Sequence, residues 1–274
     1  MSEGKIERAY IVPGLPHLVL GAREGGWDDL RRALRTAGER VRLFAPDVLV
    51  LYSTQWISVL GHSFQIHPHP KGLHVDENWH EMGNFPFDFR VDTELGTRAA
   101  AIAASRGLAT KTVSYEGFPI DTGTLVALHF FNPASTLPVS LVSCNIYAGR
   151  EDSLTLGQAL GQAIRESGRR AVLIACTALS ARFFTTDIQP SEDRIGRPED
   201  EVWNRRVLDL IRQGKNSEVV EIGPRYAEEA GVDMGFKAFY WLMGALGVPT
   251  VAGEVLAYGP LWGTGAAVVE YDLA

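Results

Sequence analysis

Cysteine is scarce in this sequence, with only Cys144 and Cys176 among 274 residues. A disulfide framework and a Cys-x-x-Cys zinc site are therefore excluded, and two isolated thiols fit a reducing cytoplasm. Long apolar runs are also missing, since none approaches the roughly 18 residues of a transmembrane helix, and the segment MSEGKIERAY holds no apolar signal region. We expect a cytoplasmic protein with no membrane partner.

Basic residues are too few for a protein that binds polyanions. Lys and Arg number 26 against 33 Asp and Glu, which gives a net charge of −7, so nucleic acid is not an expected partner. The sequence contains no phosphate-binding Gly-x-x-x-x-Gly-Lys-Ser/Thr loop, no Gly-x-Ser-x-Gly elbow and no His-Glu-x-x-His motif. These absences argue against the common nucleotide-binding, serine-hydrolase and zinc-protease classes.

Short apolar runs alternate with amphipathic segments along the chain. Runs rich in β-branched residues predict buried strands at 9–12, 48–52, 139–147, 171–176 and 266–271. Helical patterns separate them, at 27–44, 93–105, 154–167, 201–211 and 236–246. The alternation predicts an α/β layered fold with a central mostly parallel or mixed sheet flanked by helices, in a single domain over residues 1–274.

A histidine follows each of the first two predicted strands. The first strand leads through Pro13 and Pro16 to His17, and the second leads past Trp56 to His62. Sites in α/β sheets gather in loops at the carboxyl ends of strands, so both histidines are candidate functional residues. The segment 67–70 alternates histidine with proline, and we interpret it as a solvated loop.

One acid, Glu254, lies in the otherwise apolar segment 251–258. A carboxylate in such a position caps a backbone group, pairs with Arg or Lys, or binds a metal. Two histidines and one carboxylate form the facial triad of non-haem Fe(II) oxygenases, which leaves positions open for a chelating substrate and O2. Zinc with a bound water suits the same trio, so a metal hydrolase stays open as an alternative.

Several longer stretches resemble a known family. They are YSTQW (52–56), HVDENW (74–79), GFPIDTGT (117–124), EDRI (192–195), WNRRV (203–207), VDMGFK (232–237), and YGP (258–260) with 263–270. In these stretches the sequence resembles the class III extradiol ring-cleaving dioxygenases, of the protocatechuate 4,5-dioxygenase catalytic-subunit superfamily. Within that superfamily it is similar to the subunits of 2-aminophenol 1,6-dioxygenases.

The resemblance implies an Fe(II) cofactor held by His17, His62 and Glu254. The family's ligands follow the first strand, follow the next strand, and precede the C-terminal glycine-rich strand, which matches these three positions. The resemblance also implies that an ortho-aminophenol or catechol chelates the iron and that O2 opens the aromatic ring. We expect His129 and Tyr258 to act as catalytic residues that stabilise charge during the reaction.

Two positions depart from the pattern of the family's active members. Those members have a histidine after a Leu-Ser pair, where this chain has Ala181, and a histidine in an Asp-His-Gly stretch, where this chain has Thr122. The resemblance implies a homo-oligomer, or a hetero-oligomer with a homologous subunit, since aminophenol enzymes pair a catalytic subunit with a related one that has lost its metal site. A non-catalytic structural subunit is therefore the alternative to an Fe(II) dioxygenase.

Overall fold

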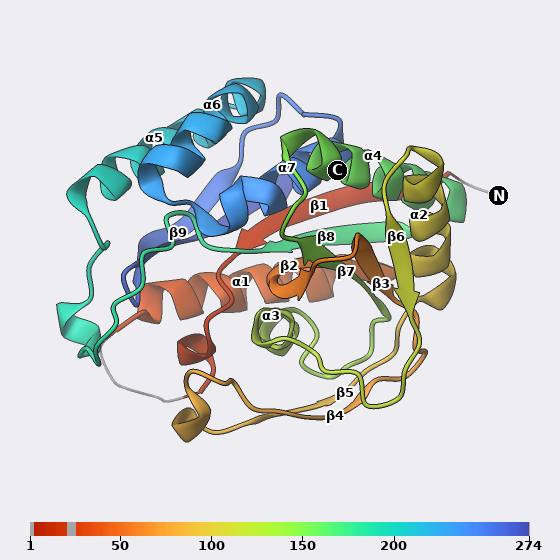
Figure 1. Cartoon of the computed structure of the whole chain (residues 1–274), viewed down its shortest axis with the longest axis horizontal. Coiled ribbons are helices and arrows are strands. Elements are labelled where there is room, and N and C mark those ends of the chain that lie inside the picture. Colours follow the sequence, from red (N-terminus) through yellow and green to blue (C-terminus); the bar gives the residue numbers. More distant parts are fainter. Residues whose placement is uncertain (1–2, 21–25, 274) are drawn as a thin grey trace.

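The computed structural model describes residues 3–20 and 26–273, and its centre is an eight-stranded sheet in the order β6-β3-β7-β2-β8-β1-β10-β9 (Figure 1). The strands of this sheet are β1 (Lys5–Val12), β2 (Val48–Ser58), β3 (His62–Gln65), β6 (Thr110–Val113), β7 (Val139–Asn145), β8 (Arg170–Cys176), β9 (Glu254–Leu261) and β10 (Thr264–Asp272). Neighbours from β7 to β1 are parallel, whereas β10 is antiparallel to both β1 and β9. The predicted α/β fold is confirmed, with a mixed sheet.

Helices cover both faces of this sheet. They are α1 (Asp28–Phe44), α2 (Thr93–Ser105), α3 (Thr122–Phe131), α4 (Arg150–Ser167), α5 (Pro198–Arg212), α6 (Asn216–Ala230) and α7 (Lys237–Leu246). One buried core joins the sheet to α1 and α3, and a second core on the other face joins it to α2 and α4 through α7. Within the described residues, no helix is long and apolar enough to cross a membrane.

Two antiparallel hairpins complete the fold, one separate from the large sheet and one within it. The short strands β4 (Lys71–His74) and β5 (Phe85–Asp88) form a separate antiparallel pair beside α3 (Figure 1). Strands β9 and β10 are joined by a two-residue turn, Trp262-Gly263, in which both residues have positive φ, at 55° and 85°. Such a turn matches the twist of a hairpin, so the glycine-rich stretch 259–265 holds a hairpin turn.

Candidate functional site

A cavity of about 970 Å³ lies beyond the carboxyl ends of parallel strands in the sheet. Gly14 follows β1, Gln55 lies late in β2, and Thr177 follows β8, and all three line the cavity. The β4–β5 hairpin supplies a second side, and Trp262 of the β9–β10 turn supplies a third. The cavity therefore lies at the sheet edge where ligand sites of α/β folds are expected.

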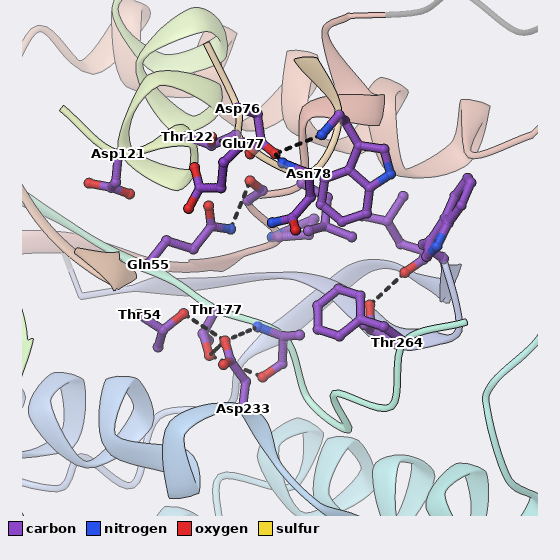
Figure 2. A pocket seen from close by; sticks show the side chains of 18 of the residues that line it. Thr54, Gln55, Asp76, Glu77, Asn78, Asp121, Thr122, Thr177, Asp233 and Thr264 are labelled. Atoms are coloured by element: carbon purple, nitrogen blue, oxygen red, sulfur yellow. Dashed lines mark hydrogen bonds between the residues drawn. The ribbon is translucent and has the colours of Figure 1, made fainter. Parts of the chain in front are cut away.

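A chain of three polar groups fixes the hairpin side. Thr122, the first residue of α3, donates its hydroxyl proton to Asp76 at 2.6 Å (Figure 2). Because that proton is used, the Thr122 oxygen accepts from His74 Nε2 at 2.7 Å, so His74 has its proton on Nε2. The other Asp76 oxygen accepts the N–H groups of Asn78 and Trp79. Asp76 thus ties the hairpin to α3 and saturates its own carboxylate.

A second carboxylate, Asp233, lies across the cavity from the hairpin (Figure 2). It accepts the hydroxyls of Thr54 and Thr177 at 2.6 and 3.0 Å and the N–H of Ala178 at 3.0 Å. Burial raises the pKa of the Asp233 carboxyl, and these donors act against that rise. This carboxylate anchors the loop after β8 to β2.

Trp79 and Trp262 form an aromatic wall, with His17 buried behind it. The His17 ring centroid lies 4.8 Å from Trp79, 4.6 Å from Trp262 and 5.2 Å from Trp27. His17 is only 2% exposed. Its imidazole therefore packs between indole rings.

Asp193 holds the turn that carries Trp262. Its carboxylate accepts the N–H of Trp262 at 2.6 Å, the N–H of Gly263 at 2.9 Å and the indole N–H of Trp27 at 2.7 Å. A tryptophan with positive φ is strained, because its Cβ crowds the backbone. The three hydrogen bonds to one carboxylate stabilise that conformation.

The structure places the three predicted metal ligands far apart. His17 follows β1 and His62 begins β3. Three strands lie between β1 and β3, so the two strands are four interstrand spacings apart, about 19 Å at roughly 4.8 Å per spacing. Glu254 begins β9, whereas Trp262, which contacts His17, follows the end of β9, about 26 Å further along at roughly 3.3 Å per residue. The predicted trio is thus corrected: its members do not form one coordination set.

Glu254 belongs to an ion-pair network that joins β9 to α1, β1 and β10. Its side chain is 60% exposed and accepts from Arg40 at 2.7 Å. The same guanidinium pairs with Glu270, which is 2% exposed. Glu270 also accepts a hydrogen bond from Arg8 and, at 3.0 Å, one from the Tyr10 hydroxyl. Of the three roles open to the isolated acid in the sequence, pairing with an arginine is the one found.

The predicted catalytic residues also lie outside the cavity lining. His129 is the exposed residue of the otherwise buried helix α3, and its ring contacts Phe130. Tyr258 lies in β9 and donates its hydroxyl to Glu201 of α5. Burial raises the pKa of Tyr258, so it stays protonated. These positions correct the expectation that both residues face a reacting substrate.

The residues present do not fit an Fe(II) centre. Across residues 3–20 and 26–273, no three His, Cys, Asp or Glu side chains converge closely enough to hold a metal ion. His74, the single histidine among the described cavity residues, donates its Nε2 proton to Thr122. The nearby carboxylates Asp76, Asp121 and Asp233 each accept at least one side-chain hydroxyl. The cavity histidine and these three aspartates, which are ligand types that iron prefers, are therefore used within the protein.

The end of β1 leaves no room for a ligand side chain at Gly14. A Cβ placed there would lie 2.5 Å from the Cys176 sulfur and 2.8 Å from the Gly123 Cα. The segment that follows β1 therefore packs directly against the amino end of α3, and only backbone faces the cavity at Gly14.

The sequence alone leaves Asp76 open between a lid over a pocket and a hydrogen-bonded structural loop, and it assigns Asp233 to a helix pair, yet both residues line the cavity. The i, i+4 spacing predicts that Asp233 forms a helix pair with Lys237, whereas the Lys237 ammonium donates to the Ile146 carbonyl at 2.7 Å and Asp233 bonds to threonines. The sequence signal for Asp76 is its place in HVDENW, where it precedes the two N–H groups that it caps.

Comparison with known proteins identifies a consistent family. Residues 12–269 match the family model described as the catalytic LigB subunit of aromatic ring-opening dioxygenase. The chain is 37% identical to the 2-aminophenol 1,6-dioxygenase alpha subunit of a Pseudomonas species, over 98% of this chain and 99% of that one. It is 34% identical to the beta subunit of the Pseudomonas enzyme, over 100% and 96% of the two chains.

More distant proteins agree with this result. The Escherichia coli 3,4-dihydroxyphenylacetate 2,3-dioxygenase is 24% identical over 91% of this chain and 89% of that one. The crystal structure of an uncharacterized Escherichia coli K12 protein superposes with a TM-score of 0.69 at 14% identity, covering 97% of this chain and 99% of that one. That structural likeness supports the fold alone.

Proposed function

Because the chain belongs to the LigB family of aromatic ring-opening dioxygenases, we propose that it acts with O2 in opening the ring of an ortho-aminophenol or catechol, as one subunit of a hetero-oligomer. In this proposal a homologous partner subunit holds the Fe(II), and this chain contributes no metal ligands. Family membership implies a metal cofactor for ring opening, so another subunit has to supply it. We place this single-domain subunit in the cytoplasm.

The observation that carries the proposal is the internal use of the histidine and of two buried aspartates at the cavity. His74 and Asp76 are joined through Thr122, and Asp233 is joined to Thr54 and Thr177. A metal would have to displace these hydrogen bonds and leave buried donors without partners, which costs free energy. A subunit that works beside a metal-bearing homologue does not face this cost.

Two further features support a hetero-oligomer. The Pseudomonas relatives are named as the alpha and beta subunits of one enzyme, and this chain is similar to both along almost its whole length. Large apolar side chains are also exposed at Ile57, which lines the cavity, at Val59 and Leu60 just after β2, and at Tyr147 after β7. They offer an apolar surface for a partner subunit.

The test compares the chain alone with the chain co-expressed with the homologous beta subunit. Each preparation is loaded with Fe(II) under anaerobic conditions, desalted, and assayed for iron content and for O2 uptake with 2-aminophenol and with catechol. We expect neither bound iron nor O2 uptake for the chain alone, and both for the co-purified pair. Stoichiometric iron and O2 uptake in the isolated chain would show instead that it is a complete Fe(II) dioxygenase.

A further inference from the structure

The cavity has an aromatic wall and, among its described lining residues, no Lys or Arg, although the chain contains 26 of them. Trp79, Trp262 and Phe183 supply the wall, and the two indole rings lie 5.9 Å apart at 77°. Both tryptophans are fixed by backbone hydrogen bonds, to Asp76 and Asp193. The wall is therefore rigid enough to hold a flat ring.

The charged groups that line the cavity are acidic. Asp76, Asp121 and Asp233 accept hydrogen bonds from the protein, whereas Glu77 forms no hydrogen bond or ion pair within the described ranges. Figure 2 shows Glu77 beside Gln55 and Asn78 on the side of the cavity opposite Asp233. A ligand in this space meets negative potential and amide groups.

We propose that this cavity binds aromatic amines, neutral or protonated, and rejects aromatic rings that carry a carboxylate. An anionic ring would lose its hydration without gaining a cationic partner and would approach several like charges. A ring with an amino group gains contacts with the indole faces, and a protonated amine also gains attraction from the carboxylates and the indoles. The inference rests on the proposed function, which makes a small aromatic compound the relevant ligand.

The test uses two probes with the same ring and opposite charge, 3,4-dihydroxyphenethylamine and 3,4-dihydroxyphenylacetate, with 2-aminophenol as the neutral probe. Each is titrated into the isolated, metal-free chain by calorimetry. We expect both amines to bind at least about tenfold more tightly than the acid, a difference of roughly 1.4 kcal/mol. Equal affinities, tighter binding of the acid, or no binding of any probe would overturn the proposal.

Variants assign the charge selection to the cavity. Glu77→Gln should weaken 3,4-dihydroxyphenethylamine binding about two- to fivefold, and Glu77→Lys should weaken it further and strengthen binding of the acid. Glu39→Lys, at an exposed position of α1, is the matched control and should leave all three affinities unchanged. An amine preference that survives Glu77→Lys would place the selection elsewhere and contradict the proposal. Because these titrations need neither iron nor a partner, their failure is separate from failure of the O2-uptake test.

Discussion

Thr122 donates its hydroxyl proton to Asp76 across 2.6 Å, and this bond connects helix α3 to the hairpin that covers the cavity. Active members of the family are expected to carry a histidine at the position of Thr122. In this chain the threonine has a structural role, because its hydroxyl forms hydrogen bonds with both His74 and Asp76.

Replacing Thr122 with valine keeps the volume and removes the hydroxyl. We expect Thr122→Val to lower the free energy of unfolding by about 1–3 kcal/mol, because Asp76 and His74 both lose a partner in a buried setting. Thr122→Ser keeps the hydroxyl and should recover most of this loss. Urea denaturation of the three proteins measures the difference, and an unchanged midpoint for Thr122→Val would contradict the structural role.

The two glutamates that pair with Arg40 should differ. Glu254→Ala removes an exposed carboxylate and should cost at most about 1 kcal/mol of unfolding free energy, whereas Glu270→Ala removes the buried acceptor that Arg8, Arg40 and Tyr10 share and should cost about 1–3 kcal/mol. Iron content after anaerobic loading should be the same for the co-purified pairs that contain wild type and Glu254→Ala. A loss of bound iron in Glu254→Ala would restore its predicted role as a ligand.

Asp233 should make stability fall as pH rises. Its pKa in the folded state is raised by burial above the usual 3.8, so its contribution is fully present below about that pH and is lost as pH rises through the raised value. Asp233→Asn lacks this titration. The free energy of unfolding of Asp233→Asn, relative to that of wild type, should therefore increase as pH rises from 3.8. Denaturation at a series of pH values tests this, with Asp209→Asn as a control for removing one exposed carboxylate. A pH-independent difference between Asp233→Asn and wild type would contradict the assignment.

Asp193→Ala should loosen the tryptophan wall. It removes one acceptor from three N–H donors, including those of the strained turn at Trp262 and Gly263. We expect a loss of about 1–3 kcal/mol in unfolding free energy and a shift in tryptophan emission as the indoles gain water. Arg194→Ala, at the next residue, is the matched control, and equal effects of the two variants would argue against a specific role of Asp193.

The sequence predicts the buried parts of the fold better than its edges. The predicted helix at 93–105 is α2. The predicted strands at 48–52 and 171–176 lie within β2 and β8, because strands buried on both faces are continuously apolar and are easy to recognise in the sequence. Helix α3 is missed because all but one of its residues are buried, which removes the helical period that sequence reasoning depends on.

The candidate site shows the limit of the same reasoning. His17 and His62 do follow the first two strands, but chain order does not reveal that β3 lies at the far side of β7 and β2 from β1. Glu254 is conspicuous because β9 is an edge strand with one covered face, where a single acid at its start reaches an arginine on α1. Family resemblance identified the chemistry of the family, whereas hydrogen-bond partners decide which residues of this chain remain available for it.

The position of β1 in the sheet has a consequence for synthesis of the protein. Strand β1 pairs with β8 on one side and with β10 on the other, so it is synthesised well before either of its partners. Until β10 has emerged, β1 presents an open edge or stays unpaired, which is the kind of surface that chains in neighbouring polysomes can capture. The sheet is therefore completed only when β10 has emerged and the Trp262 hairpin has closed.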